Sequence, residues 1–145
     1  MPDIRHRVVI DSPPEPIYQA IATPEGVSDW WSRGGVTGGT DVGSKLEFRF
    51  GSPDPAAVME ITELEPSTHV RWHCTGGADD WIDTTVDFTL APRDGGTAVL
   101  FAHDDWRDSN EFMAHCSARW AYFLLSLKKL VETGTGTPFP DDTKF

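Results

Sequence analysis

The sequence has no long apolar run, few cysteines and few basic residues. None of its apolar runs approaches the ~20 residues that a membrane-spanning helix needs, and Met1 to Arg7 lack the apolar core of a signal peptide. We therefore expect no membrane insertion and a cytoplasmic location. Only two cysteines are present, Cys74 and Cys116, which is too few for a disulfide framework. We expect both to be reduced thiols.

The shortage of basic residues limits the choice of partners. Lys and Arg total 12 against 23 Asp and Glu, which gives a net charge of -11 at pH 7. This charge repels phosphate backbones and anionic headgroups, so nucleic acids and acidic membranes are excluded as expected partners. A chain of 145 residues has the size of one domain and can bury enough surface to fold without metal or disulfide.

Motifs for metal, phosphate or nucleophilic chemistry are also missing. On a strand, His69 and His73 share a face but lie about 13 Å apart, and Cys74 points the other way, so we expect no metal. The sequence has no Gly-x-Ser-x-Gly motif. The glycine-rich segment 34–43 precedes a strand rather than a helix, so it is predicted to be a loop and not a phosphate-binding one. We expect no cofactor.

Alternating apolar and polar residues are the main positive signal. In residues 4–11, Ile4, His6, Val8 and Ile10 share one face, which predicts a strand with one buried side. The same alternation recurs between turn-like separators, which predicts an antiparallel sheet of about six strands with one solvated face. The later strands are predicted around residues 45–50, 59–62, 69–74, 86–90 and 99–103.

Helical spacing occurs in three segments. Two short helices follow the first strand, with Ser12 and Thr23 as predicted N-caps, and the second runs to the Trp30-Trp31 pair. A long amphipathic helix is predicted from Ser109 to Thr133, capped by Asp108 or Ser109 and ended by Gly134.

These elements predict an α+β fold in one domain, residues 1–134. A sheet with one apolar face needs a cover, and the long helix is the only element with enough apolar length. The predicted architecture is therefore a curved antiparallel sheet wrapped on the C-terminal helix. Residues 135–145 form a polar, proline-containing segment that we expect to be a flexible tail.

Four stretches resemble the START-like (SRPBCC) superfamily with its helix-grip fold. They are Ser12–Ala20, Thr23–Trp31, Gly95–His103 and Arg119–Gly134. The branch they resemble contains the bacterial proteins related to the activator of the heat-shock-protein-ninety ATPase. Arg119 stands where this family usually has Gly, close to the expected cavity mouth. The resemblance implies a cavity between sheet and helix that takes up lipids, sterols, or polyketide or flavonoid-like rings. Some members are polyketide cyclases, and one branch binds a chaperone of the stress response.

The inward-facing residues are the candidate cavity lining, although the same positions also fit a solid core. Trp81 and Trp106 flank loops and are expected at the rim. The candidate lining residues are Trp30, Trp31, Phe48, Met59, Trp72, Phe88, Phe101, His103, Cys116, Trp120, Phe123 and Leu124.

Three functions remain open. The leading hypothesis is a cofactor-free, non-enzymatic protein that binds a small hydrophobic molecule. The second is a cyclase or hydrolase that uses His103, which lies on the inner face beside Asp104 and Asp105, as a general base. The absence of a clearly inward carboxylate favours binding. The third is an interaction module for a chaperone or another protein, against which the charged outer face counts.

Overall fold

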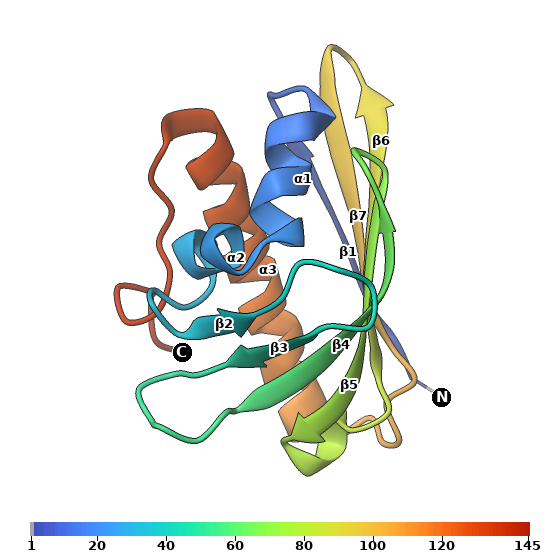
Figure 1. Ribbon diagram of the computed structural model, residues 1–145, viewed down its shortest axis with the longest axis vertical. Helices are drawn as coiled ribbons and strands as arrows, with labels where there is room; N and C mark the ends of the chain where they lie inside the picture. Colours follow the sequence, from blue (N-terminus) through green and yellow to red (C-terminus); the bar gives the residue numbers. More distant parts are fainter. Residues whose placement is uncertain (1) are drawn as a thin grey trace.

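The computed structural model describes residues 2–145. A single curved sheet wraps around the long helix α3, and the short helices α1 and α2 lie on the same side of the sheet (Figure 1). The helix-grip fold and the α+β class predicted from the sequence are confirmed. The elements in order are β1 (Ile4–Ile10), α1 (Pro14–Ala22), α2 (Pro24–Trp30), β2 (Val36–Gly38), β3 (Lys45–Phe48), β4 (Ala57–Glu65), β5 (His69–Gly77), the 3-10 helix η1 (Asp79–Trp81), β6 (Thr85–Arg93), β7 (Gly96–Asp104) and α3 (Glu111–Thr133).

The sheet is antiparallel throughout and has seven strands in the order β1-β7-β6-β5-β4-β3-β2. This is one more than the sequence predicted. The additional strand, β2, lies in the glycine-rich segment that was expected to be loop, and its Val36 pairs with Phe48 of β3. Three residues are too few to show an alternating pattern, so β2 is recognised as a strand only by its pairing with β3.

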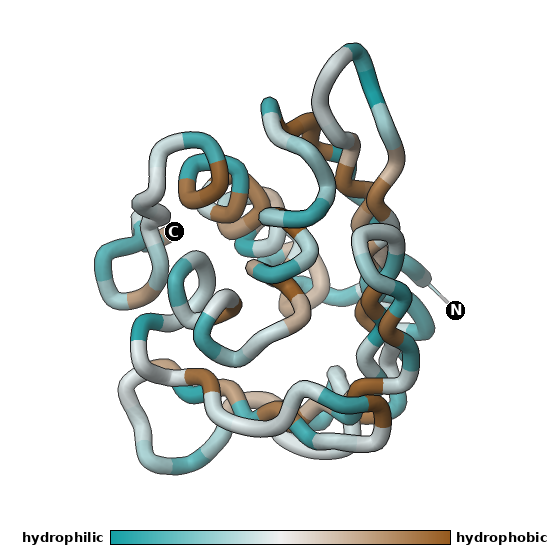
Figure 2. Tube along the Cα trace, turned by 45° about the horizontal axis from the view of Figure 1, so that its top comes forward, coloured by the Kyte–Doolittle hydropathy of each residue, from teal (hydrophilic) through white to brown (hydrophobic). Residues whose placement is uncertain are grey.

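The predicted inner face is confirmed by the burial of alternate residues. Trp72 and Cys74 of β5 are fully buried, whereas Arg71 and His73, which alternate with them, are only partly covered. Hydrophilic residues gather in the connecting loops, and hydrophobic ones lie along the strands and helices (Figure 2). The register of β4 against β5 shifts after Val58 and again after Ile61. Such irregularities bend and twist a strand, which helps this sheet to curve around α3.

Two of the helix starts differ from the prediction. Helix α1 is preceded by Pro13, and no side chain caps it; the Ser12 hydroxyl instead donates to the Pro13 carbonyl at 2.9 Å. The prediction that Ser12 caps this helix was therefore wrong. The prediction for α2 is confirmed, because Thr23 Oγ1 accepts a hydrogen bond from the Gly26 N–H at 3.0 Å.

Helix α3 begins two residues later than predicted. Its N-cap is Asn110, whose Oδ1 accepts a hydrogen bond from the Met113 N–H at 2.9 Å, so neither Asp108 nor Ser109 is the cap. Gly134 ends the helix as predicted, in the left-handed conformation with φ 89° that glycine adopts without strain. None of the helices within residues 2–145 is long and apolar enough to cross a bilayer.

Residues 135–145, expected to be a loose tail, pack against the domain. The Phe139 N–H donates to the Trp31 carbonyl, and the Arg33 N–H donates to the Phe139 carbonyl, both at 2.9 Å. The Thr137 N–H donates to the Ser126 hydroxyl on α3 at 2.8 Å. The segment makes these contacts through its own backbone groups, which leave no periodic pattern in the sequence. We call residues 135–145 the C-terminal segment.

Candidate ligand-binding site

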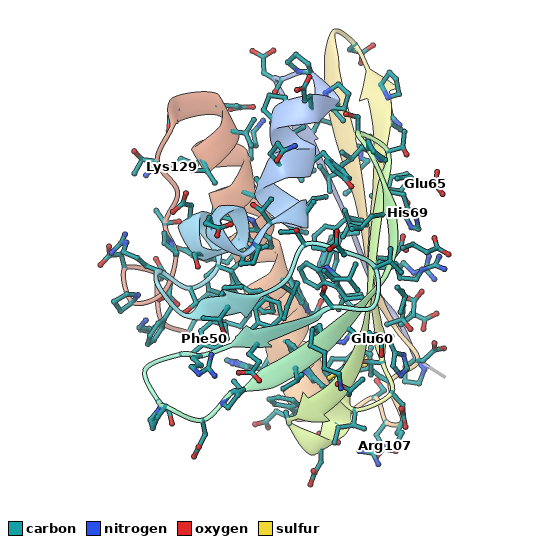
Figure 3. The ribbon with its side chains drawn as sticks, viewed as in Figure 1. Phe50, Glu60, Glu65, His69, Arg107 and Lys129 are labelled. Carbon is teal, nitrogen blue, oxygen red and sulfur yellow. The ribbon has the colours of Figure 1, made fainter. Side chains whose placement is uncertain are left out.

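A cavity of about 420 Å³ lies beside the N-terminal half of α3. Its other walls come from Trp31 at the end of α2, the β3–β4 connection with the start of β4, η1 and the residue before it, and the C-terminal segment. Phe50, labelled in Figure 3, belongs to the β3–β4 side, and its ring centre is 5.7 Å from that of Phe139 in the C-terminal segment. The lining residues are Trp31, Phe50, Ala56, Ala57, Ala78, Trp81, Phe112, His115, Cys116, Arg119, Trp120, Phe123, Phe139, Lys144 and Phe145.

Three tryptophans from three different elements form one wall of this cavity. Trp81 of η1 stacks on Trp120 of α3 with 6.1 Å between ring centres and 16° between planes. Trp31, which follows α2, lies 4.7 Å from Trp120 and 6.3 Å from Trp81. We call Trp31, Trp81 and Trp120 the tryptophan wall. Large apolar ring faces of this kind favour contact with flat or acyl ligands.

The structure divides the predicted lining residues into two groups. Trp31, Cys116, Trp120 and Phe123 do line the cavity, together with Trp81, which was expected at its rim. The remaining candidates are buried in the hydrophobic core and do not line the cavity: Trp30, Phe48, Met59, Trp72, Phe88, Phe101, His103 and Leu124. An inward-facing position therefore does not by itself identify a cavity residue.

Most of the lining residues that the sequence did not suggest come from outside the regular strands. Phe139 and Phe145 are aromatic residues in an otherwise polar segment, and this contrast is the feature of the sequence that could have identified them as lining residues. Ala56, Ala57 and Ala78 leave space because their side chains are small. The others in this group are Phe50, Phe112, His115 and Lys144.

One edge of the cavity carries an ion cluster. The Arg119 guanidinium lies over the Phe123 ring at 4.7 Å and the Phe145 ring at 5.1 Å. It forms an ion pair with Asp142 and donates a hydrogen bond to the Thr143 carbonyl at 2.8 Å.

Lys144 completes the cluster, with its Nζ 2.5 Å from Asp142 Oδ1. The Asp142 side chain has no exposed surface, whereas that of Lys144 is 62% exposed. Burial alone raises the pKa of Asp142, but hydrogen bonds from Lys144 and Arg119 outweigh it and hold the pKa below its usual value. Asp142 is therefore ionised at neutral pH. We call Arg119, Asp142 and Lys144 the ion cluster.

His103 lies behind the cavity wall rather than in it. Its Nδ1 accepts a hydrogen bond from the Trp120 indole N–H at 3.0 Å, and its Nε2 is 2.8 Å from Thr84 Oγ1. Burial lowers the pKa of His103 to about 3, so the ring is neutral at physiological pH. Both ring nitrogens are engaged, which leaves neither free to take a proton from a molecule in the cavity.

The two cysteines have the properties of unreactive thiols. Both are buried and free. Burial raises the pKa of Cys116 to about 11, against the lowering effect of the Trp81 indole, and burial also raises the pKa of Cys74. Because the thiolate is the nucleophile, a thiol with a raised pKa is poorly suited to catalysis at neutral pH.

A second cluster of titratable groups lies on the outer face of the sheet. Potential ligand atoms of Glu63, Glu65 and His69 lie within 4.8 Å of one another. Glu65 and His69 point away from α3 (Figure 3). His69 is already paired, with Nδ1 2.9 Å from Glu63 and Nε2 2.5 Å from Asp87. The cluster is an ion-pair network on a solvated surface, and it is separate from the cavity.

Together, the fold and the cavity define a START-like protein of the helix-grip type. Residues 11–132 match the family described as activator of Hsp90 ATPase homolog 1-like protein. The chain belongs to this family. No curated protein matches its sequence.

Solved structures support the same assignment. The solution structure of an Aha1 dimer from Colwellia psychrerythraea is 38% identical with a TM-score of 0.83, and the match covers 94% of this chain and 100% of the other. CalU16 from Micromonospora echinospora matches with a TM-score of 0.78 at 19% identity, over 99% of this chain and 73% of the other. A protein from Staphylococcus saprophyticus matches with a TM-score of 0.75 at 19% sequence identity, and the match covers 93% of this chain and 95% of the other. The last two establish likeness of fold alone.

Proposed function

We propose that this protein binds a small, mostly apolar molecule in the cavity beside α3. The observation that carries the proposal is the tryptophan wall facing about 420 Å³ of space. This volume lies within the roughly 300–1,000 Å³ of small-molecule sites, and the lining has the usual composition of many apolar residues and few polar ones. Lipids and polyketide or flavonoid-like molecules are the ligand classes that the family resemblance implies.

Catalysis by His103 is less well supported. The hydrogen bonds from Trp120 and to Thr84 use both ring nitrogens, and a pKa of about 3 makes the ring a weak base. A cyclase or hydrolase would also need a second polar group beside the substrate. Of the described residues that line the cavity, none is an aspartate or glutamate.

A protein-interaction role is the second candidate. The family description refers to activation of the Hsp90 ATPase. At the cavity, Phe112 and Phe145 are 38% and 56% exposed, which leaves apolar surface for a partner. Adding the protein to an Hsp90 chaperone and measuring ATP hydrolysis tests the chaperone form of this candidate, and an unchanged rate excludes activation of that ATPase.

Fluorescence titration with the neutral probe N-phenyl-1-naphthylamine tests the ligand-binding proposal. We expect saturable binding of one molecule per chain. Ala56 lines the cavity and is an exposed residue, so Ala56→Trp should fill part of the cavity and lower the affinity by at least roughly tenfold, or about 1.4 kcal/mol. Ala118→Trp places the same side chain on an exposed part of α3 that does not line the cavity, and it should bind like the wild type. Absence of binding, or equal loss in both variants, overturns the proposal.

A further inference from the structure

We infer that the ligand of this cavity is a ring-containing apolar molecule that carries an anionic group, such as a carboxylate, and that the anion lies at the Arg119 edge. This inference rests on the proposed function, since it specifies the chemical class of the molecule that the cavity takes up.

The first observation is the sign of the charges around the cavity. Acids outnumber bases by 23 to 12 in the whole chain. Of the described residues that line the cavity, however, none is acidic, while Arg119 and Lys144 are basic and His115 can donate a hydrogen bond. The local excess of positive charge opposes the overall charge of the protein and favours a negatively charged ligand.

Three acids near the cavity, Asp142, Asp141 and Asp80, are engaged with partners of their own. Asp142 is held between Arg119 and Lys144. Asp141 pairs with Arg33 at 2.6 Å, and Asp80 accepts a hydrogen bond from the Asn110 amide at 3.4 Å. Within the ion cluster, two cations face one carboxylate, so its three side chains together carry one net positive charge.

The second observation is the way Arg119 is held. Its guanidinium lies over the rings of Phe123 and Phe145, and two of its five N–H groups are used, by Asp142 and the Thr143 carbonyl. The remaining N–H groups have a fixed direction, so an anion bound there loses little side-chain entropy. Only 20% of the side-chain surface is exposed, and partial exclusion of water strengthens a charge-assisted hydrogen bond.

The two features are adjacent along one helix. Trp120, at the centre of the tryptophan wall, follows Arg119 directly in the sequence, and both line the cavity. A molecule that carries both rings and an anion can therefore contact Trp120 with its rings and Arg119 with its anion. The cavity contains the elements needed to orient such a ligand: an apolar wall and, next to it on α3, a positively charged group.

A matched pair of probes tests the inference. 8-Anilinonaphthalene-1-sulfonate has the same rings as N-phenyl-1-naphthylamine and adds one sulfonate. A purely apolar cavity prefers the neutral probe. We expect the wild type to bind the sulfonate at least roughly tenfold more tightly at low ionic strength, with the preference shrinking as salt is added.

Removing the whole ion cluster separates its effect from that of the aromatic wall. The triple variant Arg119→Met, Asp142→Asn, Lys144→Met leaves no buried carboxylate unpaired. It should lose the preference for the sulfonate and keep binding the neutral probe. The matched control is a second triple variant that removes the same residue types elsewhere: Arg5→Met, Asp104→Asn and Lys129→Met. Arg5 and Asp104 form an ion pair at 3.1 Å, and Lys129 lies near the far end of α3 (Figure 3). This control should keep the preference.

The outcomes are distinguishable. If neither probe binds the wild type, the proposed function itself fails. If the neutral probe binds but the sulfonate binds no more tightly, only the anionic ligand is overturned. Equal losses in the triple variant and the control also overturn it, because they show a general charge effect. If circular dichroism shows that the triple variant does not fold, Lys144→Met alone replaces it, because the Lys144 side chain is exposed. This single variant should lose part of the preference for the sulfonate. An unchanged preference overturns the inference.

Discussion

The indole N–H of Trp120 donates a hydrogen bond to Nδ1 of His103 at 3.0 Å. An indole only donates, so Nδ1 carries no proton and the neutral ring has its proton on Nε2. That nitrogen donates to Thr84 Oγ1 at 2.8 Å, and the Thr84 hydroxyl donates to the Trp81 carbonyl at 2.5 Å. The chain of bonds connects two members of the tryptophan wall through the sheet. His103 is therefore a positioning residue for the cavity.

The stability of the protein should decrease as the pH falls below about 6.5. The pKa of His103 is about 3 in the folded protein and 6.5 in the unfolded chain. Between these values only the unfolded chain takes up the proton, so the contribution of His103 is complete above pH 6.5 and decreases below it. From pH 6.5 to 5, the free energy of unfolding should fall by about 2 kcal/mol from this residue. Urea denaturation at several pH values measures it.

A non-titrating variant isolates this effect. His103→Gln lowers stability at pH 7 but should remove the His103 part of the pH dependence, whereas the exposed His115→Gln should leave the dependence of the wild type unchanged. An identical slope in wild type and His103→Gln would show that His103 is not the group responsible.

The bond between Trp120 and His103 should make a measurable contribution to stability. Trp120→Phe keeps an aromatic ring but leaves Nδ1 as a buried acceptor without a partner, which costs about 1–3 kcal/mol in addition to lost packing. In the described part of the chain the Trp31 indole makes no hydrogen bond, so Trp31→Phe controls for loss of ring area. Equal destabilisation of the two variants in urea would contradict the role of this bond.

The start of α3 offers a direct test of its cap. Asn110→Ala removes the side chain that accepts from the Met113 N–H and should destabilise the protein by about 1 kcal/mol. Ser109→Ala, one residue earlier, should have little effect. A larger effect at Ser109, measured by thermal or urea denaturation, would place the helix start as the sequence suggested.

The C-terminal segment should be ordered on the timescale of amide exchange. The N–H groups of Arg33 and Phe139 bond across the junction between this segment and the residues after α2. We expect both to exchange at least roughly tenfold more slowly than in a free chain. Asp142→Asn weakens the ion cluster and should speed both, whereas Glu132→Gln, near the end of α3, should not. If both amides of the wild type exchange as fast as those of an unfolded chain, the C-terminal segment is a flexible tail, as the sequence predicted.

The fold was predictable because each main strand carries a clear alternation. Residues such as Val70, Trp72 and Cys74 alternate with polar ones, and the long helix has its own period, so the sheet and its cover follow from local patterns. β2 was not predictable, because it has three residues and is defined by pairing with β3. The docking of the C-terminal segment was not predictable either, because its hydrogen bonds are made by backbone groups of Phe139, Trp31 and Arg33.

The cavity was only partly predictable, for a different reason. Alternation identifies the side chains that face inward, but it does not distinguish close packing from empty space. Phe88 and Phe101 pack edge to face at 5.3 Å and form solid core, whereas Trp120, on the same side of the sheet, borders the cavity. The difference depends on small residues such as Ala57 and on the C-terminal segment, which are distant in the sequence from the tryptophans.

The position of the C-terminal segment has a consequence for how the cavity wall can be altered. Phe139, Lys144 and Phe145 form part of the cavity wall but contribute no strand to the sheet and no turn to α3. Substitutions there alter the shape and charge of the cavity while the residues that fold the domain stay the same. The cavity wall can therefore change through a short peripheral segment, whereas changes to its other walls alter residues of the sheet or of α3.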